Sequence, residues 1–258
     1  MSAQATSGGR VVVALVRMET EAELGALLRL ARGLAAEVEV AWLEDRRLEQ
    51  AAALPFTRAV TRYGRLVSFE VEEVRRGLRL FAARLERRVR ELAAGTVGCR
   101  LVTRTATATL RLAGPRDVLV LTSADLRAVA EAFGAEVLTR DGPVVVPLSE
   151  TGPVVAVTAG DPRTLALVRR LADGDAGTVV LATDEEGVRA GLGEAVGRVR
   201  LETAAGDVLN RRLADLIQRG VRLAVADPAL VPVLMAALDA VAGAGGAGDA
   251  ASPETRER

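Results

Sequence analysis

The sequence predicts an α/β protein made of two parallel-sheet domains in tandem, each a three-layer α/β/α arrangement. Continuous apolar runs of five or six residues alternate with helical patterns, which is typical of strands buried on both faces of a parallel sheet. The opening strand–helix–strand pattern at 11–43 restarts at 153–182, after the turn Ser149–Gly152. Arg170–Gly174 also repeats the spacing of Arg29–Gly33, so the second half resembles the first.

These observations set the expected boundaries. We expect a first domain at 10–149 and a shorter second domain at 152–240. The segments 1–9 and 241–258 are rich in small and polar residues and are expected to be disordered.

The chain begins with a predicted strand–helix–strand unit. Val11–Val16 and Val38–Leu43 are apolar runs of strand length. Thr20 and Glu23 have capping-box spacing and predict a helix start between these strands. The inward face of that helix is expected to comprise Leu24, Leu27, Leu28, Ala31 and Leu34.

A long helix is predicted at about 68–94. At 1.5 Å per residue it would span roughly 40 Å, which is more than is needed to cover a strand, so it is expected to overhang its sheet. Arginines on its opposite face alternate with glutamates, which favours a solvated, ion-paired surface over one that binds RNA. Its apolar face is formed by residues at steps of three and four: Val74, Leu78, Phe81, Leu85, Val89 and Leu92.

The connection 46–66 before this helix contains the apolar segment Leu54-Pro55-Phe56. Two interpretations are open. The segment is either exposed and packs on a partner chain, or it folds back on the core of the first half.

Three further strands and a helix complete the first half. Cys99–Thr105 alternates in polarity and is expected nearer an edge of the sheet, while Val118–Thr122 is apolar throughout. Asp125–Phe133 has the pattern of a short helix. Val144–Leu148 contains Pro147, which cannot donate to a ladder and therefore predicts an edge strand.

In the second half, Asp161-Pro162 predicts a helix start after the strand Pro153–Thr158. A later helix is expected from Asp207 to Gly220. Further strands are predicted at Thr178–Ala182, Arg198–Glu202 and Val221–Val225.

The segment from Asp227 to residue 240 has two interpretations. Asp227-Pro228 favours a helix start, but Pro232 would disturb the second turn of that helix. Val231–Met235 fits a last strand equally well.

Composition excludes most catalytic classes. The 34 basic residues, all arginine, balance 34 acidic ones, so nothing indicates a nucleic-acid or anionic-membrane partner. Without histidine or lysine there is no Ser-His-Asp catalysis, no histidine metal ligand, no Schiff base and no P-loop lysine. The single cysteine, Cys99, excludes an intramolecular disulfide. No apolar run of 18 residues and no signal pattern are present, so a cytoplasmic protein is expected.

Several segments together resemble tandem universal stress proteins. They are the strand Val11–Val16, the strand and acidic exit Val40–Asp45, the segment Leu54–Arg58, and the strands Asp117–Leu121 and Gly142–Val146. The resemblance covers mainly residues 10–160 and implies a Rossmann-like fold in each half.

Nucleotide-binding members of that family have an acidic residue after the first strand and G-x2-G-x9-G-[ST] after the fourth. Here the first strand ends Val16-Arg17-Met18, without the acid. The segment Thr122–Leu126 has no glycine pair and has Asp125 where a phosphate would lie. In the second half Gly160-Asp161 retains part of the first feature, and Ala226–Pro228 lacks the second. The resemblance therefore implies degenerate nucleotide-binding motifs.

A degenerate ligand site would use residues at the carboxyl ends of the strands. The alternative roles of these residues are helix caps at Thr122-Ser123 and Gly160-Asp161, and surface ion pairing at Asp45 with the neighbouring arginines. The candidate ligand-binding residues are Val16, Asp45, Thr122, Ser123, Gly160 and Asp161.

We therefore expect a protein that is not an enzyme, needs no cofactor and acts as a regulatory or interaction scaffold in stress response. It would work through a protein partner or self-association. The alternative is a stress sensor that binds ATP or another adenine nucleotide at an atypical phosphate site.

Overall fold

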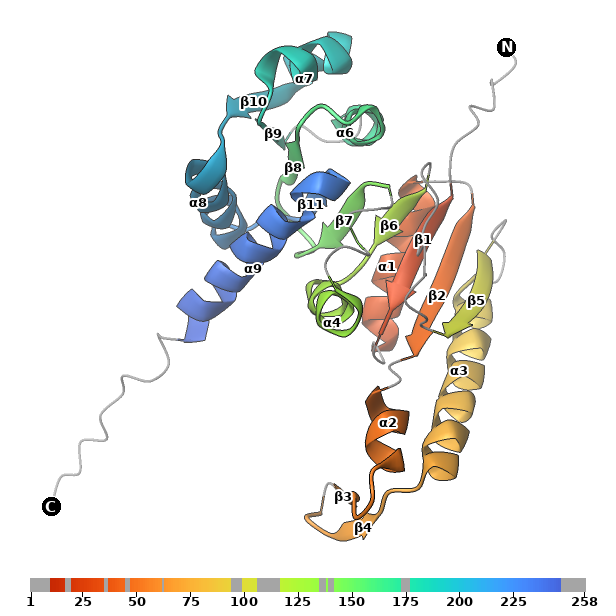
Figure 1. The fold of residues 1–258 in the computed structure, drawn as a ribbon. Helices are drawn as coiled ribbons and strands as arrows, with labels where there is room; N and C mark the ends of the chain where they lie inside the picture. The colour runs from red at the N-terminus through yellow and green to blue at the C-terminus, as the bar shows by residue number, and fades with distance from the viewer. Residues whose placement is uncertain are drawn as a thin grey trace, which may run out of the picture.

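The computed structural model describes residues 10–16, 20–34, 37–44, 47–61, 63–93, 99–105, 117–134, 138, 142–172 and 177–246. Within these residues, nine strands form one sheet with helices on both faces, and a two-stranded hairpin stands apart from it (Figure 1). The predicted fold class is confirmed to this extent: a mostly parallel, Rossmann-like α/β/α structure.

Five parallel strands of the first half are adjacent in the sheet, in the order β5-β2-β1-β6-β7. Counted along the chain this is 3-2-1-4-5, the order of a Rossmann-like sheet. The strand β5 lies at the edge, as its alternating sequence predicts. Their bounds are Val11–Leu15 (β1), Val38–Glu44 (β2), Cys99–Thr105 (β5), Val118–Val120 (β6) and Val144–Pro147 (β7).

Four strands of the second half continue the same sheet, in the order β10-β9-β8-β11. They are parallel to one another, and β11 pairs antiparallel with β7. The two predicted domains therefore share one continuous sheet. The bounds are Val154–Thr158 (β8), Thr178–Ala182 (β9), Val199–Thr203 (β10) and Leu223–Ala226 (β11).

The prediction that Pro147 marks an edge strand is wrong, because β7 lies between β6 and β11. The β6 ladder ends where Val120 faces Val145, so Pro147 lies beyond the end of β6. On the other side the backbone continues to pair, with the Leu148 N–H donating to the Arg222 carbonyl at 2.9 Å. Proline is tolerated at this position because β6 has already ended on that side of β7, so no hydrogen bond of the ladder is lost with the missing N–H.

Among the described residues, seven helices cover the two faces of the sheet. One buried cluster contains side chains of α1 (Glu21–Leu34), α3 (Val71–Ala93), α6 (Pro162–Ala172) and α7 (Glu185–Leu192). The other contains side chains of α4 (Ser123–Phe133), α8 (Gly206–Gln218) and α9 (Val231–Gly246). Alternate residues of β1 enter the two clusters, as the period of a strand requires. Each cluster runs through both halves of the chain, so the halves also share their cores.

The start of α1 has the predicted capping box. The Thr20 N–H donates to Glu23 Oε2 at 2.8 Å, and the Glu23 N–H donates to Thr20 Oγ1 at 3.3 Å. All five residues predicted for the inward face of this helix are buried. On α3 the predicted ion pairing is also present, with Arg75–Glu72 at 3.0 Å and Arg88–Glu91 at 2.6 Å.

The connection before α3 differs from the prediction. It forms a helix, α2 (Arg47–Ala53), and a hairpin of β3 (Arg58–Val60) and β4 (Leu66–Ser68). Gly64, at φ 74°, allows the turn in which the Thr61 N–H donates to the Arg65 carbonyl at 2.8 Å. Ser68 therefore ends a strand, and α3 begins at Val71 instead of 68.

The ambiguous segment after Asp227 is helical. A short 3₁₀ turn, η2 (Pro228–Leu230), leads into α9. Pro232 lies in the first turn of α9, where a missing N–H removes no helical hydrogen bond. The helix continues to Gly246, beyond the expected end of the second half at residue 240. A helix that the sequence analysis did not identify, α7, begins after Asp184, whose carboxylate accepts the Gly187 N–H at 3.1 Å. A second 3₁₀ segment, η1 (Gly193–Arg198), follows it.

Candidate functional site

The strand order creates two places where α/β proteins commonly bind ligands. The strand order reverses between β1 and β6, and again between β8 and β11, because the chain continues from the two strands of each pair in opposite directions along the sheet. Ligands of open α/β sheets bind outside the carboxyl ends of the strands at such switch points. The residues that follow these four strands therefore define the candidate site in each half.

In the first half the switch point is occupied by Asp125, which is fully buried. Its Oδ1 accepts the backbone N–H of Val16, the residue after β1, at 2.9 Å. Its Oδ2 accepts the Thr122 hydroxyl at 2.7 Å, and the Thr122 Oγ1 accepts the Asp125 N–H at 3.0 Å. Thr122 is thus the N-cap of α4, and Asp125 joins that helix to the end of β1.

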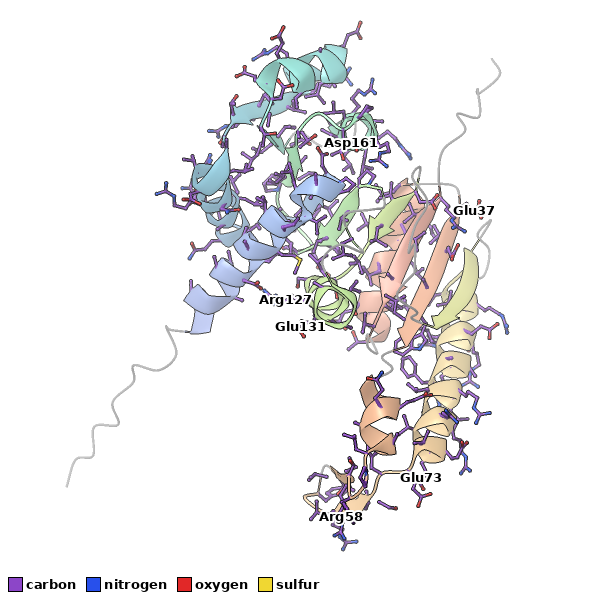
Figure 2. All side chains as sticks on the ribbon, viewed as in Figure 1. Glu37, Arg58, Glu73, Arg127, Glu131 and Asp161 are labelled. Atoms are coloured by element: carbon purple, nitrogen blue, oxygen red, sulfur yellow. The ribbon has the colours of Figure 1, made fainter. Side chains whose placement is uncertain are left out.

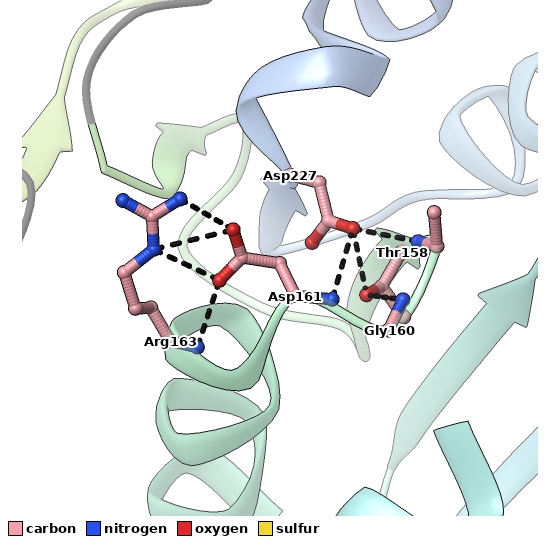
Figure 3. Close-up of polar contacts among 6 residues, drawn as sticks. Thr158, Gly160, Asp161, Arg163 and Asp227 are labelled. Carbon is pink, nitrogen blue, oxygen red and sulfur yellow. Dashed lines mark hydrogen bonds and ion pairs between the residues drawn. The ribbon is translucent and has the colours of Figure 1, made fainter. Parts of the chain in front are cut away.

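In the second half the switch point is occupied by Asp227, which is 2% exposed. Its Oδ2 accepts the Thr158 hydroxyl at 2.9 Å and the Ala159 N–H at 2.6 Å, with a longer contact to the Asp161 N–H at 3.4 Å (Figure 3). The Thr158 Oγ1 also accepts the Gly160 N–H at 2.9 Å. Gly160 adopts a φ of 101°, which a residue with a side chain rarely adopts.

The two switch points have the same construction. In each, a buried aspartate from the segment after the fourth strand accepts the N–H of the residue directly after the first strand. Backbone N–H groups in this position can bind phosphate when they are free. Here protein carboxylates already occupy them, and the negative charge of an ionised carboxylate would repel a phosphate. The arrangement therefore favours strand ends whose N–H groups are hydrogen-bonded within the protein over a site that binds an anion.

The carboxyl group of Asp227 has a raised pKa. Burial away from water is the cause, and the polar groups of Thr164, Ala159, Thr158 and Asp161 around the carboxyl lower its pKa in part. Within the described residues, neither the buried Thr164 hydroxyl nor the buried Asp227 Oδ1 has a hydrogen-bond partner.

Asp161 faces the other way. Figure 3 shows its carboxylate directed at Arg163, the second residue of α6, while its backbone lies beside Asp227. The Arg163 N–H and Nε–H donate to Asp161 Oδ1 at 2.8 and 2.9 Å. These hydrogen bonds lower the pKa of Asp161. Asp161 is therefore paired at the helix start and is not presented to a ligand.

The six residues predicted for a ligand site are thus only partly brought together. Val16 and Thr122 meet at one switch point, through Asp125; Ser123 begins α4 beside them. Gly160 and Asp161 lie at the other, and Asp45 lies outside the described residues.

The sequence analysis did not assign Asp227 or Thr158 to the site. The available signal was an acidic residue shortly after the fourth strand in both halves: Asp125, five residues after Val120, and Asp227, directly after Ala226.

A second candidate site projects from the body of the protein. We call the segment of α2, the β3–β4 hairpin and the first ten residues of α3 (Val71–Leu80) the arm; it extends away from the sheet in Figure 1. No described side chain between 49 and 80 is buried. Among the described residues, eight large apolar side chains are exposed, and all but Val208 belong to the arm: Leu54, Phe56, Val60, Tyr63, Leu66, Val67 and Leu80.

The chemistry available elsewhere is limited. Within the described residues there is no group of three or more acidic or cysteine side chains arranged to bind a metal ion. In the same residues no helix combines the length and apolar character needed to cross a bilayer. Comparison of the sequence with protein-family models and curated proteins, and of the structure with solved structures, found no match.

Proposed function

We propose that this chain is a non-catalytic, universal-stress-type protein that acts in the cytoplasm as an interaction scaffold, with the arm as its contact surface. The observation that carries the proposal is the concentration of exposed apolar side chains on one projecting segment. Single exposed apolar residues are normal, but a contiguous group of them marks an interaction site. The stress-related role is taken from the family resemblance.

Two further observations support a scaffold over a nucleotide sensor. The N–H groups of Val16 and Ala159 already donate to buried carboxylates. The β3–β4 hairpin, which carries the exposed side chains of Val60, Tyr63, Leu66 and Val67, lies at the far end of the arm from the sheet (Figure 1). A scaffold needs an accessible surface, and the arm is the largest apolar one among the described residues.

Photo-crosslinking in cells tests the proposal. A photoreactive phenylalanine analogue at Phe56, whose side chain is 98% exposed, should give a discrete protein adduct. The same analogue at Val208, which is 56% exposed in the body of the protein, is the matched control and should give none. No adduct from position 56, or equal adducts from both positions, would contradict the proposal.

Thermal melting with millimolar ATP, ADP and AMP tests the alternative. A ligand that binds only the folded state raises the melting temperature by mass action. We expect no increase with any of the three nucleotides. An increase that Asp125→Asn or Asp227→Asn alters would favour the sensor.

A further inference from the structure

The arm is a folded segment without an interior. Its α2 helix has 7 residues and its two strands have 3 each, and none of its described side chains from 49 onward is buried. Helices this short and isolated two-stranded hairpins are marginal in water. One contact between its parts is the Arg75–Glu49 ion pair at 3.4 Å, which joins α3 to α2 at the surface. Such a segment needs a covering surface to be stable.

The connection between α2 and β3 also holds a strained residue. Phe56 adopts a φ of 68°, a region that bulky side chains rarely adopt. Its side chain is nevertheless almost fully exposed. Strained residues persist where surrounding contacts fix them, and they cluster at binding sites.

The exposed apolar surface can supply the apolar centre of a dimer contact, with the neighbouring polar side chains as its rim. An uncovered aromatic side chain exposes about 150–250 Å², and the arm has two of them with several aliphatic neighbours, which together give several hundred Å². A standard protein interface buries about 800 Å² on each partner. Val60 and Leu66 lie opposite each other on one face of the hairpin. Six side chains of the arm are exposed by 43% to 98%: Leu54, Phe56, Val60, Tyr63, Leu66 and Val67.

The charges of the arm identify what covers it. The hairpin carries exposed Arg58 and Arg65, and exposed Glu70 and Glu73 lie at the start of α3. Figure 2 shows Arg58 and Glu73 both at the far end of the arm. Within the described part of the chain, none of these four side chains makes an ion pair. An anionic membrane or a purely acidic partner would be attracted by the arginines and repelled by the adjacent glutamates. A second copy of the same arm presents both signs.

We propose that the arm pairs with the arm of a second copy of this chain around a two-fold axis. This inference rests on the proposed scaffold function and names its partner. In a two-fold contact the same patch serves both subunits, so the hairpin of each copy can face the α3 start of the other. The apolar side chains, Phe56 foremost, then lie between the two arms, and the two bodies remain at the outer ends with their sheets uncovered by the contact.

Sedimentation equilibrium of the full chain, with the variant Phe56→Ser, tests the pairing. The full chain should sediment with twice its 27.0 kDa mass at micromolar concentration. Phe56→Ser should weaken dimerisation by about tenfold or more, because central aromatic residues dominate such interfaces. The control Val208→Ser should leave the dimer unchanged. Both positions are solvent-exposed, so loss of folding does not confuse the result.

Charge reversal distinguishes a two-fold contact from any other. In Arg58→Glu alone, and in Glu73→Arg alone, like charges face each other and the dimer should weaken. An equimolar mixture of the two variants should dimerise, because each interchain contact then joins opposite charges again. A monomeric full chain, a dimer insensitive to Phe56→Ser, or a mixture as weak as the separate variants would overturn the pairing. An adduct from position 56 to a different protein would contradict the pairing but leave the scaffold function in place.

Discussion

The body and the arm of this protein both contain helices, strands and large apolar side chains, but they bury those side chains to different extents. In the body, every residue of β1 and the inward face of α1 is buried. In the arm, Leu54, Phe56 and Leu66 are of the same apolar kind and remain exposed. The difference shows that apolar patterning alone does not build a core. The body has a sheet to pack its helices against, whereas the arm has no second layer within its own chain.

The two switch points lie in the body, and their aspartates are buried like the apolar residues around them. At both of them a buried carboxylate, Asp125 or Asp227, accepts hydrogen bonds from several donors. The arm instead has exposed charges without ion-pair partners at Arg58 and Glu73, among the residues that the structure describes. A closed body and an open arm together favour a protein that acts by contact.

The largest expected difference concerns side-chain truncation. Leu28→Ala, at a position 2% exposed, should lower the free energy of unfolding by about 2–5 kcal/mol, because it leaves a cavity. Phe56→Ala should change it by less than about 0.5 kcal/mol, as surface substitutions do. Urea unfolding of both variants, at concentrations where the chain is monomeric, measures this. Similar losses in the two variants would place Phe56 in a core and break the comparison.

The next effect concerns the strand ends. Asp125→Ala removes the acceptor of the Val16 N–H and of the Thr122 hydroxyl, and it should cost about 2 kcal/mol. Asp125→Asn keeps one acceptor oxygen and is the control, with a smaller loss. Equilibrium unfolding checks both variants. If Asp125→Ala were as stable as the natural chain, the carboxylate would not be what closes the first switch point.

Polar contacts at the surface should give smaller losses that also separate body from arm. Thr20→Ala removes a helix cap of α1 and should cost about 1 kcal/mol. Arg75→Ala removes exposed pairs with Glu49 and Glu72 in the arm, and it should cost between about 0 and 1 kcal/mol. Thermal melting at low and high salt distinguishes them, since only the Arg75 effect should decrease with added salt. A salt-independent loss in Arg75→Ala would contradict this assignment.

The smallest effect is a pH dependence confined to the body. Because the pKa of Asp227 is raised, the folded state binds its proton more tightly than the unfolded state does. The stability contributed by this group therefore falls as the pH rises from the ordinary value of 3.8 through the raised pKa, and is constant above it. Asp227→Asn should remove that decrease.

Asp161 supplies the opposite case. Its pKa is lowered by Arg163, so its contribution is present above 3.8 and is lost as the pH falls through the lowered pKa. Asp161→Asn should therefore lower the free energy of unfolding at pH values above 3.8, and its difference from the natural chain should shrink as the pH falls below that value. Urea unfolding of both variants between pH 3 and pH 7 is the measurement, and coincident profiles would contradict the assignment of the two windows.

Features of the fold that depend on neighbouring residues in the sequence could be predicted, whereas features that depend on contacts between distant segments could not. The buried strands and α1 were predicted because burial on both faces, or on one helical stripe, leaves a local apolar pattern. Pro147 gave a wrong prediction because its tolerance depends on where β6 ends, which is a property of the neighbouring strand. The hairpin was missed because three-residue strands carry almost no periodic signal.

The sequence predicted where the candidate site lies, but it did not predict the hydrogen bonds that form the site. Val16 and Thr122 were selected because they follow strands of the sheet. The group that joins them, Asp125, accepts a hydrogen bond from a residue 109 positions earlier in the chain. Asp227 likewise bonds Ala159 across 68 positions. A hydrogen bond of this kind depends on which strands are neighbours in the sheet, and local sequence patterns do not predict the strand order.

Hydrogen exchange of the arm amides in the full chain, compared at dilute and concentrated protein, tests the central claim most directly. If the arm is a contact surface covered by a second copy, amides of α2 and the hairpin should be protected at high concentration and exchange rapidly on dilution, while β1 stays protected throughout. Phe56→Ser should abolish the protection of the arm at both concentrations. Arm amides that exchange rapidly at every concentration, or that stay protected on dilution, would contradict the account.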